Sequence, residues 1–434
     1  MDMVSAFFYN LFMTMAVIVF APLLFVKVIL TPKYRSRTGK RLGFGLGAQP
    51  GGAARHPRIW VHALSVGEVA SARNLVQELR RSYPQGIILF SASTRAGETF
   101  ARSILTEEVD WFVPFPFDLL ISVKRLVSWA KPDLFILVET DFWPNFLREL
   151  KRRKIPALLV NGRVSESSLA GYRNLRWLFR PLFNGFQSLA MQTEQDAASL
   201  RRMGVDPARL VVLGNLKYDA ALPGGDTKPG LDREALQIPE DAVVWVAGST
   251  HRGEEAIIFN TFQRAARSFS NLFLVVAPRN VERGGELAAM ASARGLSASR
   301  RALGGAGGGG VLILDTLGEL SSVYGVCDLA FVGGSLVPQR GHNPLEPAVH
   351  GKVVMFGPFM EDFAEISRDL LAVGGAREVH DEEELFSALS FFLSDPAERA
   401  RAGHRAQGLI ASRRGVTEAY IALIRRLLPR EGKG

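Results

Sequence analysis

The sequence predicts an α/β protein with two doubly wound domains that face a cleft, preceded by an N-terminal membrane-anchor helix. Short apolar runs alternate with helical patterns along most of the chain, as in parallel sheets covered by helices on both faces. Residues 222–230, with two prolines and three glycines, interrupt this alternation near the middle of the 434 residues. Residues 6–26 form a long apolar segment without a charge. Clefts between domains are preferred ligand sites, so we expect the ligands there.

Residues 1–30 are predicted to anchor the protein in a membrane. The uncharged segment 6–26 is about as long as a bilayer-spanning helix needs to be, although Asn10, Thr14 and Pro22 weaken it. Basic residues follow directly, and such clusters normally stay on the cytoplasmic side of the membrane: Lys27, Lys33, Arg35, Arg37, Lys40 and Arg41. We therefore expect a single uncleaved anchor with all later domains on the cytoplasmic face. The alternative is an interfacial helix that lies in the membrane surface.

The first domain is assigned to residues 31–221 and begins with a Gly-rich linker at 42–57. The apolar run at 58–64 leads through a tight turn into a helical pattern at 69–79, which indicates strand, turn and helix. Strands are predicted at 59–64, 86–92, 134–139, 157–162, 188–192 and 210–215.

The second domain is assigned to residues 222–434, where the alternation resumes. Strands are predicted at 243–250, 272–279, 310–315, 329–335 and 353–357. The glycine run at 304–310 joins a helix to a strand and lacks the Lys and Ser/Thr of a phosphate-binding P-loop, so it is interpreted as a surface loop.

Charge and cysteine content limit the classes of partner. The formal net charge of +9 favours an anionic partner, which could be nucleic acid, an anionic membrane or a phosphorylated substrate. No nucleic-acid-binding module is recognised in the sequence, which places nucleic acid last. Cys327 is the single cysteine, so an internal disulfide is excluded and a reducing compartment is favoured.

Glu68 lies in the turn between the first apolar run and the first helical pattern. Ligands of α/β folds collect beyond the carboxyl ends of strands, so a carboxylate here could act as a base. An acid in the first turn of a helix is also favoured by the helix dipole and the free N–H groups. On this turn alone the structural role is the favoured one.

Glu139 and Arg163 end two further strands of the first domain and are expected to face Glu68 across neighbouring strands. Glu139 could orient a substrate hydroxyl, or it could form a structural ion pair with Arg163. The residues alone leave these two interpretations equally supported.

Polar residues at strand ends of the second domain predict a nucleotide site. Ser249, in "GSTHRGEE", offers a hydroxyl beside free N–H groups that suit a phosphate, and Arg279 can add a charge-assisted contact to the same anion. Glu346, near Asn343 in "HNPLEP", could accept hydrogen bonds from both ribose hydroxyls. Each residue alone could equally cap a helix or form a surface ion pair. Their common position at strand ends favours the nucleotide site.

No metal site is expected. His62, His251 and His342 have spacings that match no standard zinc pattern, and no Asp-x-Asp pair offers a magnesium site. The chain also lacks the G-x-S-x-G motif of the α/β hydrolases. The chemistry is therefore predicted to be independent of metal and cofactor.

The motifs together resemble one enzyme family, in its order along the chain: "HALSVGE", "VETDFWPN", "NGRVS", "GNLKYD", "GSTHRGEE", "APR..ER", "GEL...Y", "FVGGSL" and "GHNPLEP". The resemblance is to the bacterial 3-deoxy-D-manno-octulosonic acid (Kdo) transferases of lipopolysaccharide biosynthesis, and it extends from the N-terminal segment to about Ile366. It implies a glycosyltransferase-B fold with two Rossmann-like domains, the first holding the acceptor and the second the donor, CMP-Kdo. It also implies lipid IVA, or a Kdo-bearing form of it, as acceptor, and an inner-membrane anchor.

The resemblance also implies roles for individual residues. Glu68 matches the catalytic base, and the donor-site motifs are matched by Lys217, Ser249, Arg279, Asn343 and Glu346. Glu139 and Arg163 match motif positions with supporting roles on the acceptor side.

The chain departs from the family pattern at several positions. Asp141 stands where the family usually has Glu, "PRNVER" replaces "PRHPER", and Phe359 and Asp362 alter a late loop. The alternatives are another lipid-acceptor glycosyltransferase that uses a UDP-sugar and a membrane-tethered nucleotide-binding regulator without catalysis. The sequence leaves open how many Kdo residues are added, the acyl chains of the acceptor, the oligomeric state and any protein partner.

Overall fold

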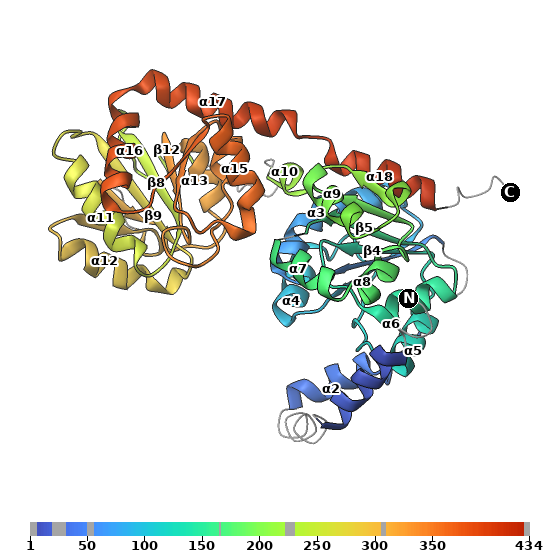
Figure 1. Ribbon diagram of the computed structural model, residues 1–434. Helices are drawn as coiled ribbons and strands as arrows, with labels where there is room; N and C mark the ends of the chain where they lie inside the picture. The colour runs from blue at the N-terminus through green and yellow to red at the C-terminus, as the bar shows by residue number, and fades with distance from the viewer. Residues whose placement is uncertain are drawn as a thin grey trace. The chain divides into compact units, whose positions relative to one another are not determined.

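The computed structural model describes residues 7–19, 32–49, 56–164, 166–221, 231–304 and 310–428. The chain divides into two compact units, one made of Met1–Ala220 with Gly415–Gly434 and the other of Ala221–Arg414. Each unit contains one seven-stranded sheet in which all paired strands are parallel, with helices on both faces (Figure 1). The prediction of two doubly wound α/β domains is therefore confirmed.

The first unit contains the N-terminal helices, the first sheet and the last helix of the chain. Its strands are β1 (Arg58–Ala63), β2 (Ile87–Ala92), β3 (Trp111–Phe112), β4 (Leu134–Val138), β5 (Ala157–Gly162), β6 (Ser188–Met191) and β7 (Leu210–Val212). Residues 7–19 are helical. The other helices are α2 (Pro32–Arg41), α3 (Val66–Ser82), α4 (Arg95–Ile104), α5 (Leu120–Ala130), α6 (Pro144–Arg152), α7 (Glu166–Asn174), α8 (Arg176–Phe183), α9 (Glu194–Arg202), η1 (Pro207–Arg209), α10 (Lys217–Ala220) and α18 (Val416–Leu427).

The second unit contains the second sheet. Its strands are β8 (Val243–Thr250), β9 (Leu272–Pro278), β10 (Ser297–Arg300), β11 (Gly310–Ile313), β12 (Leu329–Val332), β13 (Val353–Phe356) and β14 (Ala376–Glu378). Its helices are α11 (Glu254–Ala265), η2 (Val281–Arg283), α12 (Gly284–Ser292), η3 (Arg301–Leu303), α13 (Leu320–Val326), α14 (Leu345–Val349), η4 (Glu361–Phe363), α15 (Ala364–Ala372), α16 (Glu382–Ser394) and α17 (Pro396–Ser412).

The strand order of each sheet creates a point where the direction of winding reverses. The first sheet has the order β3-β2-β1-β4-β5-β6-β7, so the reversal lies between β1 and β4. The second has the order β10-β11-β9-β8-β12-β13-β14, and its reversal lies between β8 and β12. Ligands of open α/β sheets bind beyond the carboxyl ends of the strands at this reversal. The loops that follow β1, β4, β8 and β12 are therefore the places to look for a site.

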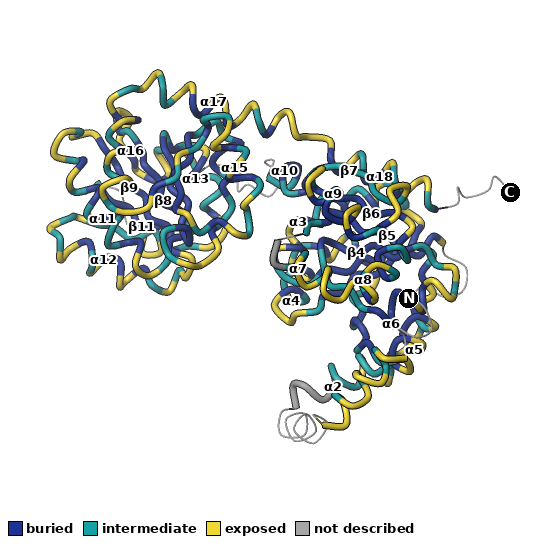
Figure 2. The backbone as a smooth tube through the Cα atoms, in the orientation of Figure 1, coloured by how far each residue is buried: buried dark blue, intermediate teal, exposed yellow. Residues whose placement is uncertain are grey.

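Burial follows from the apolar strands. All six residues of β1 are buried, which is typical of a parallel strand covered on both faces. Ile59 and Val61 pack on one face with Val69 and Leu75 of α3, whereas Trp60 points to the opposite face. Figure 2 shows the same arrangement in both units, with buried strands inside and exposed positions on the outer helices.

The last helix corrects the predicted domain boundary. All of residues 222–434 were predicted to form the second domain, but α18 belongs to the first unit. Tyr420 and Ile424 are completely buried in the core beside α3. The Tyr420 hydroxyl accepts a hydrogen bond from the Asn161 amide (2.8 Å), and the Asp219 carboxylate accepts from the amide of Thr417 (2.6 Å). The amphipathic sequence of α18 predicts a helix without indicating the sheet on which it packs.

The N-terminal helix is held to the first unit by polar contacts. The Tyr9 hydroxyl donates to Asp118 (2.8 Å), and the side-chain amides of Asn10 and Asn145 bond to each other (3.0 and 2.9 Å). No helix within the described ranges combines the length and apolar character required to cross a bilayer. Of the predicted span, residues 6–26, residue 6 and residues 20–26 lie outside the described residues.

Candidate functional site

In the first unit, the candidate site lies at the reversal between β1 and β4. Glu68 is in the first turn of α3, directly after β1, and is buried. Its carboxylate accepts hydrogen bonds from the Leu64 amide and from the Thr140 hydroxyl (3.1 Å), which follows β4. The contact with Leu64 is local and resembles a helix cap. A cap does not require the burial or the contact with Thr140, so the carboxyl also links the two strand ends.

The surroundings of Glu68 disfavour its charged form. Burial raises the pKa of Glu68 to about 8, and the negative charges of Glu139 and Asp141 act in the same direction. The hydrogen bonds from Leu64 and Thr140 lower this pKa and oppose the shift. A carboxyl with a pKa near neutral pH is matched to general acid–base chemistry.

Glu139 and its neighbours hold an unusual backbone conformation. Glu139, Asp141 and Asn161 have φ values of 60°, 82° and 55°, in the left-handed region that non-glycine residues seldom adopt. Such strain costs about 1–3 kcal/mol at each residue and is concentrated at functional sites. The side-chain amide of Asn161 donates to the Glu139 carboxylate (2.8 Å) and fixes its orientation.

The predicted acceptor-side residues therefore lie at adjacent strand ends. β1, β4 and β5 are neighbours, so Glu68, Glu139 and Arg163 follow three adjacent strands, as the sequence analysis expected. Glu139 is paired with Asn161, and Arg163 is half-buried just after β5. Thr140 was not predicted to be a partner of Glu68, although it lies in the motif "VETDFWPN".

His62 belongs to a buried hydrogen-bonded network beside Glu68. Its Nε2 lies 3.0 Å from the Asp141 carboxylate and its Nδ1 lies 2.8 Å from the Ser91 hydroxyl. Burial lowers the pKa of His62, against the effect of Asp141, which favours a neutral ring that donates through Nε2. Both ring nitrogens thus have protein partners. Within the described ranges, His, Cys, Asp and Glu form no group of three that could hold a metal ion.

In the second unit, the candidate site lies at the reversal between β8 and β12. Ser249 has a φ of 56° at an irregularity near the end of β8. β8 and β12 approach closely here, because a Cβ at Gly333 would meet the Ser249 carbonyl oxygen at 2.5 Å. α11 begins at Glu254 with Gly253 as its N-cap, so Ser249 does not cap this helix. Across the described part of the chain, no hydrogen-bond partner is found for the Ser249 hydroxyl, which leaves it available to a ligand.

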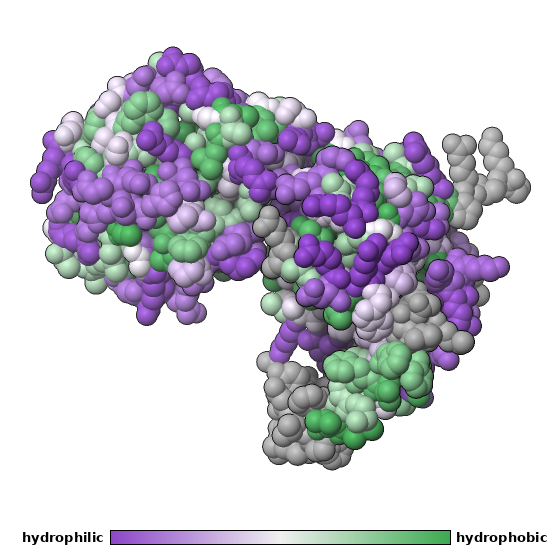
Figure 3. All heavy atoms as spheres, viewed as in Figure 1, coloured by the Kyte–Doolittle hydropathy of each residue, from purple (hydrophilic) through white to green (hydrophobic). Residues whose placement is uncertain are grey.

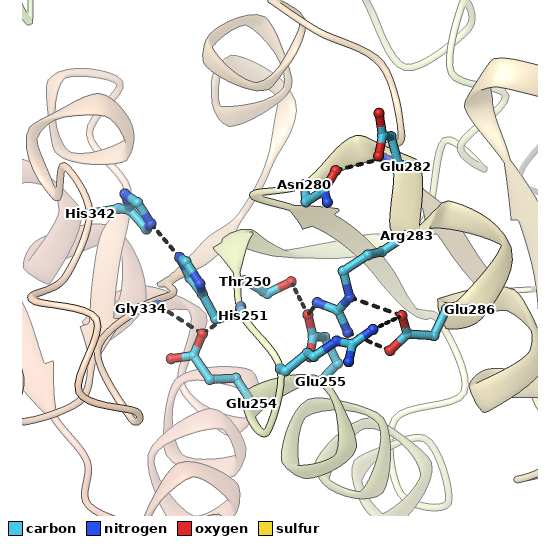
Figure 4. Close-up of polar contacts among 11 residues, drawn as sticks. Thr250, His251, Glu254, Glu255, Asn280, Glu282, Arg283, Glu286, Gly334 and His342 are labelled. Atoms are coloured by element: carbon cyan, nitrogen blue, oxygen red, sulfur yellow. Dashed lines mark hydrogen bonds and ion pairs between the residues drawn. The ribbon is translucent and has the colours of Figure 1, made fainter. Parts of the chain in front are cut away.

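Glu254 connects the loops that follow β8 and β12. Its carboxylate accepts four backbone hydrogen bonds. Two come from the amides of His251 (2.9 Å) and Gly334 (2.8 Å), which Figure 4 shows, and two from the amides of Ser335 (3.0 Å) and Leu336 (2.9 Å). Burial raises the pKa of Glu254, while these hydrogen bonds lower it. Sequence reasoning did not identify this residue, and its only signal was its position in "GSTHRGEE".

His251 and His342 also join these two loops. Their Nε2 atoms are 2.8 Å apart, their ring planes differ by 8° and their centroids are 5.1 Å apart, so the rings meet edge to edge (Figure 4). This contact requires one ring to donate and the other to accept. Burial lowers the pKa of His342 to about 4 and also lowers that of His251, and the Arg279 charge acts on both in the same direction.

Arg279 lies at the end of the neighbouring strand β9. Its backbone amide donates to the Thr250 carbonyl (3.0 Å), whereas its side chain is exposed. Within the described residues its guanidinium makes no hydrogen bond or ion pair, but its charge lowers the pKa values of His251 and His342. The segment after β9 is held by Arg283 of η2, whose guanidinium donates to the buried Glu255 carboxylate (2.6 Å; Figure 4).

Asn343 and Glu346 complete the predicted set in the second unit. The Asn343 side chain donates to the Glu346 carboxylate (3.3 Å) and accepts from the Leu345 amide (3.1 Å), which is a partial cap of α14. Burial raises the pKa of Glu346, whereas Asn343 and the Arg279 charge lower it.

Four of the predicted donor-site residues are therefore brought to one edge of the second sheet. Ser249 lies near the end of β8, and Arg279, Asn343 and Glu346 follow the neighbouring strands β9 and β12. Lys217 lies in the first unit, where it begins α10 and its amide donates to the Asn215 side chain (3.0 Å).

Comparisons with known proteins agree with this architecture. A family model described as 3-deoxy-D-manno-octulosonic-acid transferase (kdotransferase) matches residues 36–220. The 3-deoxy-D-manno-octulosonic acid transferase of Haemophilus influenzae is 31% identical over 419 residues, which cover 95% of this chain and 96% of the relative.

Two solved structures have a similar fold at low sequence identity. UDP-GlcNAc 2-epimerase from Neisseria meningitidis has a TM-score of 0.62 and 13% identity, with coverage of 85% of this chain and 100% of that chain. A glycosyltransferase from Rickettsia africae has a TM-score of 0.59 and 10% identity, with coverage of 87% and 100%.

These likenesses, with the two parallel sheets, define a protein of the glycosyltransferase-B fold. Sequence similarity along nearly the whole chain also identifies the family within this fold. The chain belongs to the 3-deoxy-D-manno-octulosonic acid (Kdo) transferase family and is a glycosyltransferase.

Proposed function

We propose that this protein transfers Kdo from CMP-Kdo to lipid IVA, the lipid A precursor, with inversion at the anomeric carbon and without a metal ion. The observation that carries the proposal is the buried Glu68 carboxyl, placed at the reversal of the first sheet with a pKa of about 8. Membership of the Kdo transferase family supports Kdo as the transferred sugar. The basic net charge of +9 suits both an anionic donor and an anionic acceptor.

In this mechanism Glu68 acts as the general base. Its carboxylate accepts the proton of an acceptor hydroxyl while that oxygen attacks the anomeric carbon of Kdo and CMP leaves. General-base assistance typically contributes about a hundredfold to ten-thousandfold to the rate. Thr140 holds one carboxylate oxygen in place, and Asn161 orients the adjacent Glu139 toward its role in binding the acceptor.

The residues at the edge of the second sheet would bind the donor. Arg279, whose guanidinium has no partner among the described residues, would stabilise the charge that develops on the departing phosphate, and the Ser249 hydroxyl would donate to the same group. Glu346, held by Asn343, would accept from the ribose hydroxyls. Lys217 is proposed as a further phosphate contact, and Arg163 as a supporting residue, on their family motifs alone.

The protein is also proposed to act at the cytoplasmic face of the inner membrane. The described N-terminal helix exposes large apolar side chains, which include Phe8, Phe12 and Ile18. Figure 3 shows a hydrophobic area on the first unit, where Figure 1 draws the N-terminal helix and α5. A lipid-linked acceptor must be met at the membrane surface, and nearby basic residues add attraction to anionic lipids.

The test is a transfer reaction with purified protein in detergent, lipid IVA and CMP-Kdo made beforehand by a generating system, with chelator added before transfer begins. The lipid product is weighed by mass spectrometry. A gain of one or more Kdo units supports the proposal and counts the additions. Unchanged lipid beside verified CMP-Kdo and an active control enzyme overturns it, in favour of a UDP-sugar donor or a regulator without catalysis. Transfer that stops with chelator and returns with added metal contradicts the metal-free mechanism.

A further inference from the structure

A cavity of about 540 Å³ lies in the first unit between the N-terminal helix and the start of α5. This volume is in the range of sites that hold small molecules. The lining residues come from three segments: Asn10, Met13 and Thr14 of the helix, Leu42 and Phe44 after α2, and Leu119, Leu120, Ile121, Ser122 and Arg125.

The lining is mostly apolar and contains one cation. The Arg125 guanidinium lies 4.3 Å from the centroid of the Phe44 ring, a cation–π contact that fixes it at the cavity. Gly43, with a φ of 83°, permits this approach, since a Cβ there would meet the Arg125 Cβ at 2.7 Å. An apolar cavity with one fixed cation suits an apolar chain attached to an anionic group.

The cavity wall is preformed. Asp118, which accepts from Tyr9 of the N-terminal helix, also accepts from the backbone amides of Asn145 (2.9 Å) and Phe146 (2.8 Å) at the start of α6. The helix is therefore fixed to the residue that holds the first turn of α6. This attachment keeps one wall of the cavity in place before any ligand arrives.

The cavity and the candidate acceptor site belong to the same unit, and Arg41 has contacts toward both. Leu42 lines the cavity, and the preceding Arg41 donates to the Phe115 carbonyl (2.9 Å). Burial lowers the pKa of Arg41, and the negative charge of Asp141 opposes this shift. Asp141 also contributes to the raised pKa of Glu68. Asp141 thus interacts electrostatically both with the proposed base and with Arg41, the residue beside the cavity-lining Leu42.

We infer that this cavity holds one acyl chain of the acceptor lipid, with Arg125 facing the anionic head group of that lipid. The inference rests on the proposed function, because it identifies which part of a lipid acceptor the first unit binds. The exposed Leu120 and Ile121 at the same position extend the apolar surface for the rest of the lipid. The competing occupants are a bulk membrane lipid and residues 20–31 of this chain, which lie outside the described residues.

The test uses two matched variants of the N-terminal helix. Thr14→Trp fills the cavity, whereas Met15→Trp adds the same ring at an adjacent exposed position that does not line it. Wild-type and variant proteins in detergent micelles are irradiated with a lipid IVA analogue that carries a diazirine in its acyl chains, and labelled peptides are identified by mass spectrometry. This assay requires no transfer, so it reports on the cavity even if the proposed function fails.

In the wild type, label is expected on the peptides that contain Met13 and Leu119 to Ile121. Thr14→Trp should reduce this labelling roughly tenfold, as overpacking of a filled site costs about that much affinity, and Met15→Trp should not. Arg125→Gln, which leaves the cavity open, should weaken labelling as well. Circular dichroism melts confirm that each variant is folded.

Three results would overturn the inference. Equal labelling of the two Trp variants, spread over the exposed helix, would show only general adsorption. Absence of label from the cavity in every folded protein would show that the acyl chain does not enter it. Equal labelling by a diazirine-bearing phosphatidylglycerol would assign the cavity to bulk lipid.

A kinetic arm separates this inference from the proposed function. Thr14→Trp should raise the KM for acylated lipid IVA and leave transfer to a deacylated acceptor unchanged. Absence of transfer to both acceptors by the wild type, together with the expected labelling, contradicts the proposed function and keeps the cavity assignment.

Discussion

Glu68 shows how a single residue can serve both structure and chemistry. Its contact with the Leu64 amide is what a first-turn acid does in many helices, and the sequence alone favoured that role. Burial and the contact with Thr140 depend on the adjacency of β1 and β4, which are separated by many residues in the chain. Sequence periodicity locates the residue at a strand end but does not supply the partner across the sheet, which depends on topology.

Replacing Glu68 with Gln should remove the general base and preserve the shape of the site. We expect kcat to fall by about a hundredfold to ten-thousandfold, with the affinity for CMP-Kdo unchanged. Steady-state kinetics and calorimetric titration of the donor measure the two effects. Glu98→Gln is the matched control, because Glu98 is also a first-turn acid, in α4, and it should keep nearly full activity. Full activity of the Glu68→Gln variant would show that Glu68 is not the general base.

The raised pKa of Glu68 predicts the pH dependence of transfer. A base must be deprotonated, so the single-turnover rate should fall about tenfold for each pH unit below a pKa of about 8 and level off above it. Thr140→Val removes a hydrogen bond that lowers this pKa, so the midpoint should move to higher pH. Thr106→Val, at an exposed position, serves as the control. An unchanged midpoint in the Thr140 variant would show that the pH dependence of the rate does not report the ionisation of Glu68.

The same shift predicts the pH dependence of stability. A buried carboxyl with a folded-state pKa of about 8 binds its proton more tightly than the unfolded chain does, so its contribution to stability is full at acid pH. That contribution is lost as the pH rises from the ordinary pKa of 4.5 toward 8. Glu68→Gln should therefore gain several degrees in Tm relative to the wild type between pH 5 and pH 9. If the difference in Tm between the two proteins does not change with pH, Glu68 is not a buried carboxyl that is neutral in the folded state.

At the scale of elements, the predicted strands are all present, and the missed ones lie at sheet edges. β3 has two residues, β10 reads SASR and β14 reads ARE, so none of them has the apolar run that marks a buried strand. The order of the strands brings the predicted site residues to one edge of each sheet. The hydrogen bonds that join one loop to another could not be predicted from the sequence. Glu254 accepts amides about 80 residues away, a pairing that no local pattern encodes.

Glu254→Ala should release the loops after β8 and β12 from each other. Removing one acceptor leaves four amides without their partner, and we expect a loss of roughly 3 kcal/mol or more in the free energy of unfolding of the second unit. Affinity for CMP-Kdo should fall with it. Denaturant titration and donor titration test this. Glu286→Ala is the control, since Glu286 is an exposed partner of arginines and its loss should change the free energy of unfolding little. Equal effects of the two changes would contradict the bridging role.

At the scale of the whole molecule, the division into two units was predicted from the break at residues 222–230, and the chain does divide at Ala220–Ala221. The return of the last helix was not predicted. α18 has the same amphipathic pattern as helices of either unit, and only its tertiary contacts with α3 and Asp219 decide where it packs. The sequence therefore identifies the domains but not the segment that completes the first one.

Truncation after residue 414 should expose the core of the first unit. Removing Tyr420, Ile421 and Ile424 uncovers apolar surface, and each such loss typically costs about 2–5 kcal/mol. We expect aggregation or a much lower Tm for the first unit. Truncation after residue 429, which keeps all of α18, should be tolerated. A soluble, cooperatively melting chain that ends at 414 would contradict the role of α18 in this core.

The position of α18 also sets an order of events during synthesis. A ribosome produces the segment up to Ala220 long before it reaches Val416, and at about 5–20 residues per second the interval is roughly 10–40 s. Through that interval the nascent first unit lacks the helix that covers α3, while the second unit, whose residues are contiguous, can already fold. The part of the enzyme made first is thus the last to be finished, and its uncovered apolar surface must be shielded until translation ends.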